Sequence, residues 1–115
     1  MSDAAGLAAD LVRIDSVNPA LIPGAAGEAE IAGFVARWLD HAGLDVDVVE
    51  PTPGRPSVIG IARGSGGGRS LLLNAHLDTV GTDAMDAPFD ARVEDGRLYG
   101  RGSYDMKGAL AAALE

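Results

Sequence analysis

Residues 70–80 read "SLLLNAHLDTV", in which three leucines lead directly to a histidine and an aspartate. A short, continuous apolar run is typical of a strand that is buried on both faces of a sheet, so we predict a central strand over residues 70–75. Side chains two positions apart in a strand share a face. His76 and Asp78 are therefore expected together at the end of this strand, where α/β sheets bind their ligands.

The segments around this strand predict an α/β domain. Apolar residues recur at helical spacing in the first forty residues, and the last ten are strong helix formers. We expect helices over 3–15, 28–42 and 106–115, strands over 44–50 and 57–62, and a hairpin over 91–100. Helices that alternate with a sheet favour a layered domain, here with a largely parallel or mixed sheet flanked by helices.

The composition excludes several classes of protein. A chain of 115 residues with 47% hydrophobic residues has the size and apolar content of one globular domain. Its net charge of −8 argues against nucleic acid or an anionic membrane as a partner. It has no cysteine, so any metal ion would be held by histidine and carboxylate side chains. The absence of a signal-like or membrane-spanning stretch makes the cytoplasm the expected location.

A second polar cluster reads "LYGRGSYDMKG", residues 98–108, and contains Asp105 just before the last predicted helix. Taken alone, Asp105 fits the N-cap of that helix. A carboxylate at this position could instead bridge two divalent cations. His76 and Asp78 have a similar alternative, because Asp78 could cap a turn while His76 is merely polar.

The remaining polar residues fit structural roles. His41 is expected at the end of a helix, where a positive charge is favoured. The glycine-rich residues 64–68 precede a strand and lack the lysine of a phosphate-binding loop, so we expect a plain turn there. Asp83, Asp86 and Asp90 are expected to be solvated.

The two polar clusters together resemble the signature of the dinuclear zinc aminoacyl hydrolases. That family includes acetylornithine deacetylase, succinyl-diaminopimelate desuccinylase and glutamate carboxypeptidase. The resemblance rests on "LLLNAHLDTV" and, about 20 residues later, "DGRLYGRGSYDMKGALAA". It extends to "LVRIDSVNP" (11–19), "IAGFVARWLDHAGLDVDVVE" (31–50) and "APFDARVEDGRLYG" (87–100), and so covers nearly the whole chain.

The resemblance implies a role for each matching residue. His76 corresponds to a ligand of one of two metal ions, and Asp105 to the carboxylate that bridges them. Asp78 corresponds to the aspartate that orients the histidine and counts as a catalytic residue. The implied cofactor is a pair of zinc ions, with cobalt as a substitute. The implied reaction is hydrolysis of an N-acyl amino acid or a terminal peptide bond by a water activated between the two ions.

Other parts of the family pattern have no counterpart in residues 1–115. The family's general base and second carboxylate ligand form a Glu-Glu pair beyond the bridging aspartate, followed by a lid and dimerisation domain and a late histidine. The resemblance thus implies the N-terminal part of a zinc-exopeptidase-like catalytic domain, truncated at its C-terminal side and inactive alone.

One alternative is a non-enzymatic interaction or regulatory domain with at most a partial metal site. In either case, an exposed sheet edge is expected to favour association or homo-oligomers.

Overall fold

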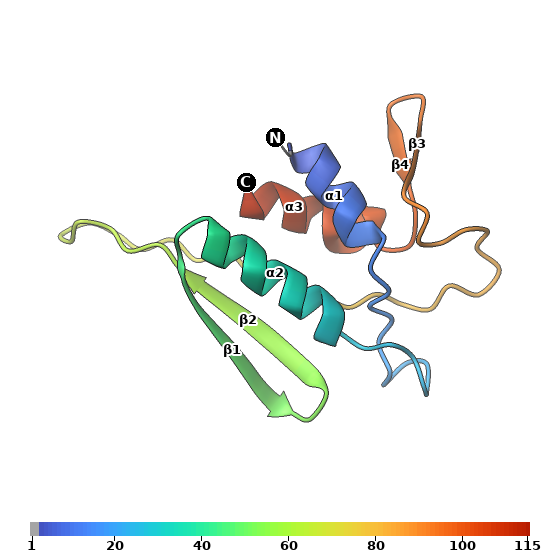
Figure 1. The fold of residues 1–115 in the computed structure, drawn as a ribbon, viewed down its shortest axis with the longest axis horizontal. Coiled ribbons are helices and arrows are strands. Elements are labelled where there is room, and N and C mark those ends of the chain that lie inside the picture. Colours follow the sequence, from blue (N-terminus) through green and yellow to red (C-terminus); the bar gives the residue numbers. More distant parts are fainter. Residues whose placement is uncertain (1–2) are drawn as a thin grey trace.

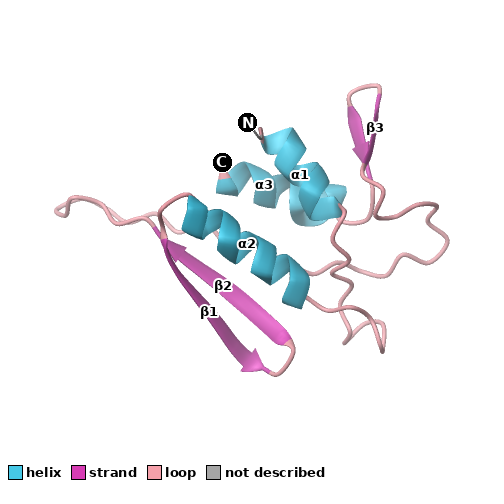
Figure 2. Ribbon diagram, viewed as in Figure 1, coloured by secondary structure: helices cyan, strands magenta, loops and turns pink. Residues whose placement is uncertain are grey.

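The structure, a computed structural model, describes residues 3–115, and its elements are drawn in Figures 1 and 2. The helices are α1 (Ala4–Val12), α2 (Ala29–His41) and α3 (Gly108–Leu114), the last preceded by a kinked turn, η1 (Ser103–Lys107). The strands are β1 (Asp45–Thr52), β2 (Arg55–Ile61), β3 (Arg92–Glu94) and β4 (Arg97–Tyr99). The α/β class predicted from the sequence is confirmed.

The first two helices begin and end where capping residues stand in the sequence. The Asp3 carboxylate accepts a hydrogen bond from the Gly6 N–H at 2.7 Å, which satisfies a free donor at the start of α1. After α2, Gly43 takes a φ of +87°, a conformation that glycine adopts at little cost. Both predicted helices are confirmed, each slightly shorter than expected.

The larger of two apolar clusters joins the three helices. It contains Leu7, Ala8, Leu11, Ile14, Ile31, Val35, Leu110 and Ala111, each at most 9% exposed. Burying a leucine or isoleucine side chain contributes about 1.5–3 kcal/mol, so this cluster is the main source of stability. It also fixes the last residues of α1 against α3, close to the polar residues described below.

The strands form two antiparallel hairpins. β1 pairs with β2 and lies along α2, while β3 and β4 form a short hairpin on the other side of the helices (Figure 1). At its turn, Asp95 and Gly96 have φ values of +51° and +72°, as a type I′ turn requires. The predicted strands over 44–50 and 57–62 and the predicted hairpin over 91–100 are confirmed.

The predicted central strand over residues 70–75 is wrong. This segment lies in no strand, and Leu71, Leu72 and Leu73 are 85%, 87% and 61% exposed. A strand needs hydrogen-bonded neighbours, and no strand of residues 3–115 pairs with this segment. The predicted parallel or mixed sheet is absent from the described residues for the same reason. The parallel pairing found among these residues is an isolated bridge between Val17 and Thr79.

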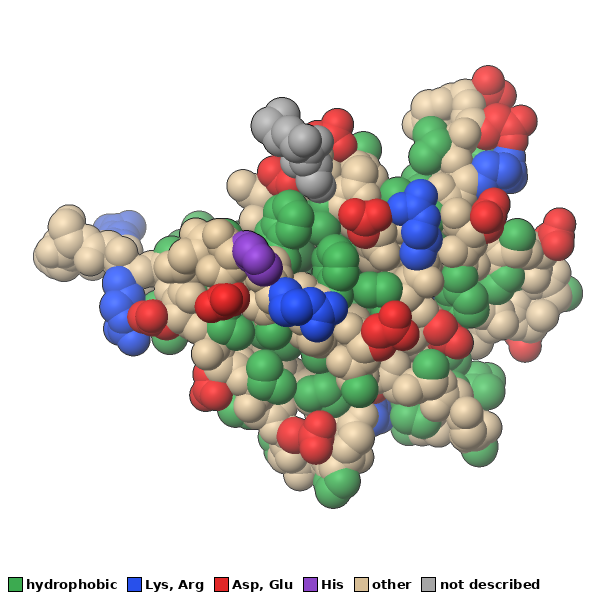
Figure 3. Space-filling view, in the orientation of Figure 1, with side chains coloured by type: hydrophobic (Ala, Val, Ile, Leu, Met, Phe, Trp, Pro, Cys, Tyr) green, Lys and Arg blue, Asp and Glu red, His purple; other side chains and the backbone are tan. Residues whose placement is uncertain are grey.

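Acidic side chains are spread over several elements on the face drawn in Figure 3. Among residues 3–115, no helix has the length and apolar character needed to cross a bilayer.

Candidate metal centre

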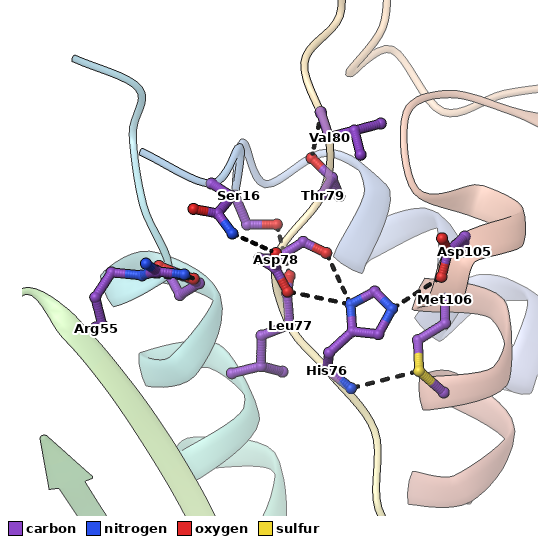
Figure 4. Close-up of polar contacts among 11 residues, drawn as sticks. Ser16, Arg55, His76, Leu77, Asp78, Thr79, Val80, Asp105 and Met106 are labelled. Carbon is purple, nitrogen blue, oxygen red and sulfur yellow. Dashed lines mark hydrogen bonds and ion pairs between the residues drawn. The ribbon is translucent and has the colours of Figure 1, made fainter. Parts of the chain in front are cut away.

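His76 and Asp105, which are 29 residues apart in the sequence, contact each other directly. The His76 Nε2 atom lies 2.8 Å from an Asp105 carboxylate oxygen (Figure 4). The backbone N–H of His76 also lies 3.4 Å from the sulfur of Met106, the residue after Asp105. The expectation that the two predicted ligands converge therefore agrees with the structure.

Asp78 lies on the opposite side of the imidazole ring. The His76 Nδ1 atom is 3.0 Å from the backbone carbonyl oxygen of Asp78 and 3.2 Å from its carboxylate. Both neighbours of Nδ1 are acceptors, and this pair of acceptors favours a proton on Nδ1. The Nε2 atom is thereby left as the nitrogen that can bind a cation, as in carboxylate–histidine–metal arrangements.

The contacts of His76 are all satisfied together when both ring nitrogens carry a proton. A neutral ring with its proton on Nδ1 would present the Nε2 lone pair to the Asp105 carboxylate, and one with its proton on Nε2 would present the Nδ1 lone pair to the two Asp78 oxygens. Partial burial lowers the pKa of His76, but the hydrogen bond to Asp105, the Asp78 carbonyl and both carboxylate charges outweigh it, and the pKa is raised.

The η1 turn places Asp105 toward His76. Asp105 has extended backbone angles inside this turn (φ −122°, ψ +93°), and α3 begins only after Lys107. The alternative interpretation of Asp105 as an N-cap is therefore wrong, because no side chain caps α3. Gly102 starts the turn with a φ of +84°, and a Cβ there would lie 2.7 Å from the Thr79 side chain.

The loop that follows α1 forms hydrogen bonds with the segment that carries His76 and Asp78. The Thr79 N–H donates to the Ser16 carbonyl, and the Asn18 N–H donates to the Thr79 carbonyl, both at 2.9 Å. The buried Ser16 hydroxyl donates to the Leu77 carbonyl at 2.8 Å. The Asn18 side chain donates to the Asp78 carboxylate at 2.9 Å.

Sequence reasoning missed this role of Ser16 and Asn18. The available signal was the segment "LVRIDSVNP", which formed part of the resemblance without a function attached to its polar residues.

Two further charged residues near the site are buried or half-buried, and the sequence did not single out either contact. The Lys107 side chain is 1% exposed, and its Nζ donates to the Ile14 carbonyl at 2.7 Å. Burial lowers the pKa of Lys107 to about 8, against the opposing effect of Asp15. Arg55 binds both carboxylate oxygens of Glu28, which raises the pKa of the guanidinium.

A cleft of about 880 Å³ runs beside the site. His76 and Asp78 line it together with Asn74 and Arg55, whereas Asp105 is not among its lining residues. The rest of the wall combines apolar side chains of α2, β2 and α3 with Leu71, Leu72 and Leu73 and with polar residues that include Glu28 and Ser57. A ligand in this cleft would meet the exposed edge of His76 next to a surface of mixed polarity.

The other candidate residues have the structural roles expected of them. The Nδ1 atom of His41 lies 2.8 Å from the Arg37 carbonyl in the last turn of α2. Asp83, Asp86 and Asp90 are all exposed. Within residues 3–115, no three or more histidine and carboxylate side chains lie close enough together to hold a metal ion. His76 and Asp105 thus offer two donors, whereas zinc sites use three or four protein ligands.

Comparison with known proteins identifies the sequence around these residues. Residues 72–115, which contain His76, Asp78 and Asp105, match the model of peptidase family M20/M25/M40. The chain resembles that family.

Three curated relatives match most of the chain. Over 110 residues, 35% are identical to N-formyl-4-amino-5-aminomethyl-2-methylpyrimidine deformylase of Halalkalibacterium halodurans, covering 90% of this chain and 26% of that protein. Succinyl-diaminopimelate desuccinylase of Xanthobacter autotrophicus is 40% identical over 113 residues, covering 94% and 28%. Acetylornithine deacetylase of Vibrio campbellii is 38% identical over 93 residues, covering 77% and 24%. The chain spans about a quarter of the length of these relatives.

Proposed function

We propose that this chain is the N-terminal part of an M20-type catalytic domain that hydrolyses an amide bond of an N-acyl amino acid or a terminal peptide bond. In this proposal, His76 and Asp105 are metal ligands, Asp105 bridges two ions, and Asp78 is the catalytic residue that orients His76. The supporting observation is the direct contact between the His76 Nε2 atom and the Asp105 carboxylate. The relatives' names, a deformylase, a desuccinylase and a deacetylase, support removal of an acyl group.

The donor atoms suit zinc, with cobalt as a substitute. An imidazole and a carboxylate are borderline-hard ligands that both metals accept, and no described residue offers a thiolate. When bound, a zinc pair lowers the pKa of water and polarises an amide carbonyl. The chain itself contributes the orientation of the imidazole, because the Asp78 carbonyl and carboxylate hold its Nδ1 proton.

The two donors are fewer than a stable zinc site needs. We therefore propose that the remaining ligands, the general base and the lid and dimerisation domain lie outside residues 1–115, and that this chain alone is inactive. The cytoplasm is the proposed compartment, and the absence of cysteine is compatible with it.

A second candidate is a non-enzymatic interaction or regulatory domain. The observation in its favour is that residues 3–115 contain no group of three metal-binding side chains.

Calorimetric titration with Zn²⁺ and Co²⁺ separates the two candidates. The wild-type chain is expected to bind Zn²⁺ weakly, and His76→Ala and Asp105→Ala are expected to abolish binding. His41→Ala is the matched control, because His41 is the other histidine of the chain and lies at the end of α2. Absence of binding to a folded wild-type chain would favour the interaction domain.

A hydrolase assay tests the proposed inactivity. The chain with Zn²⁺ is expected to show no turnover of N-acetylornithine or related amides. Turnover of about 1 s⁻¹, an ordinary enzymatic rate, would contradict the proposal that the missing residues supply the general base.

A further inference from the structure

Asn18 contacts the candidate site through both its backbone and its side chain. Its backbone N–H donates to the Thr79 carbonyl at 2.9 Å, and its side-chain oxygen accepts from the Ala20 N–H at 2.8 Å. Its side-chain nitrogen donates to one Asp78 carboxylate oxygen at 2.9 Å. The side-chain oxygen faces a donor, the Ala20 N–H, and the side-chain nitrogen faces an acceptor, the Asp78 carboxylate. The two partners together fix which way the amide points.

The two oxygens of Asp78 have different partners. One accepts from Asn18, and the other lies 3.2 Å from the His76 Nδ1 atom. The Asp78 side chain is 29% exposed, so without Asn18 its carboxylate has room to turn toward solvent. The hydrogen bond from Asn18 opposes that rotation and keeps the second oxygen beside the imidazole.

We propose that Asn18 is a positioning residue that acts on His76 through Asp78. Asn18, Asp78, His76 and Asp105 form one continuous line of polar contacts from the loop after α1 to the η1 turn: two hydrogen bonds and, between the Asp78 carboxylate and His76, a 3.2 Å ion-pair contact. This proposal goes beyond the proposed function in assigning a residue to the site, and it rests on that function only in treating the site as a metal centre. Outer partners of this kind fix the tautomer and direction of a histidine ligand.

The backbone contacts allow a clean test of the side chain. The bond from the Asn18 N–H to Thr79 and the bond from Thr79 to Ser16 do not depend on the Asn18 side chain. The loop is therefore expected to stay in place in Asn18→Ala. Asn18→Asp keeps an acceptor for the Ala20 N–H, removes the donor to Asp78 and adds a negative charge beside that carboxylate, so it is expected to displace the Asp78 carboxylate more strongly than Asn18→Ala does. Ser16→Ala is the control, because it removes a hydroxyl bond in the same loop that goes to Leu77 instead of Asp78.

The experiment is ¹⁵N NMR of the histidine rings in the metal-free chain, at a pH above the titration of His76. With two histidines in the sequence, His41 serves as the internal reference. The wild type is expected to show the Nδ1–H tautomer of His76. Asn18→Ala and Asn18→Asp are expected to shift the ring nitrogens toward the Nε2–H tautomer, whereas Ser16→Ala leaves them unchanged. In an Asp78→Ala background, Asn18→Ala is expected to add no further shift.

Two results would overturn the proposal. The first is a His76 tautomer that stays as in the wild type in both Asn18 variants. The second is an equal shift on Asn18→Ala with and without Asp78, which would mean that Asn18 acts by another route. Neither measurement uses metal or substrate. A wild-type chain that binds no Zn²⁺ would therefore contradict the proposed function while this test still gives its own answer.

Discussion

His76 has polar contacts at both ring nitrogens, and under the proposed function this makes cation binding dependent on pH. Partial burial is the largest single influence on its pKa and lowers it, but the hydrogen bond to Asp105, the Asp78 carbonyl and both carboxylate charges together raise the pKa above the ordinary value of 6.5. A proton on Nε2 competes with a metal ion for the same lone pair. The competition therefore extends to higher pH than for an unperturbed histidine.

We predict that the Zn²⁺ affinity of the chain rises as the pH increases from about 6 to about 8. Below the raised pKa the Nε2 atom is protonated, so binding must release that proton, and above it the lone pair is free. Titrations at several pH values, with proton release measured in buffers of different ionisation enthalpy, test this. An affinity that is constant over this range would show that Nε2 is not the ligand.

Lys107 makes a separate prediction about stability. Its pKa falls from 10.5 to about 8 in the folded chain, so between these values the unfolded chain binds more protons than the folded chain. The free energy of unfolding therefore gains a contribution as the pH rises from about 8 to about 10.5. Lys107→Met keeps the length of the side chain and removes this titration.

Urea denaturation of wild type and Lys107→Met across this pH range is the measurement. The free energy of unfolding of the wild type, relative to the variant, is expected to increase with pH. A difference that does not change with pH would mean that the ammonium is not desolvated in the folded chain.

At the scale of the elements, the glycine at the start of η1 sets the position of Asp105. In Gly102→Ala, the methyl group would combine a positive φ with a 2.7 Å contact to Thr79. In Gly96→Ala, φ is also positive, at +72°, but no atom lies within 4 Å of the new methyl group. The two glycines thus differ in crowding and share the unfavourable backbone conformation.

We predict that Gly96→Ala lowers the free energy of unfolding by about 1 kcal/mol, the strain of a left-handed residue. Gly102→Ala adds overpacking of about 1–3 kcal/mol and displaces η1. Urea denaturation measures the first effect, and loss of the His76–Asp105 contact by NMR measures the second. Equal destabilisation by the two substitutions would contradict the crowding at Gly102.

The elements that could be predicted from the sequence are those whose signals are local. The Asp3 cap, the positive φ of Gly43 and the Asp95–Gly96 turn each depend on a few adjacent residues, and all three are present. The strand over residues 70–75 failed because its apolar run encodes burial between neighbours that the described residues do not supply.

The site was predictable to a similar extent. His76, Asp78 and Asp105 were recognised by their motifs, and the structure brings them together. The contacts of Asn18 and Lys107 were missed because a hydrogen bond to a residue 60 positions away, or to the carbonyl of Ile14, leaves no periodic signal. The η1 turn was missed because a helix-forming sequence does not indicate where the first regular turn begins.

At the scale of the whole molecule, the exposed leucines predict self-association. Leu71, Leu72 and Leu73 are consecutive and mostly exposed, and an apolar run of this kind without a neighbouring strand tends to bury itself against another chain. Leu71→Lys together with Leu72→Lys is expected to shift the chain toward monomer in sedimentation velocity experiments.

Val93→Lys is the control, because this side chain is 68% exposed but belongs to the β3–β4 hairpin. It is expected to leave association unchanged. A wild-type chain that is monomeric at every concentration would contradict the prediction.

The central claim is that the His76 Nε2 atom and the Asp105 carboxylate together receive a divalent cation. It is tested most directly by adding Zn²⁺ to the chain with ¹⁵N-labelled histidine. The account predicts a large change in the Nε2 signal of His76, an unchanged protonated Nδ1, unchanged His41 signals and no response in Asp105→Ala. A response at Nδ1, a response at His41 alone, or the same Nε2 response in Asp105→Ala would contradict it.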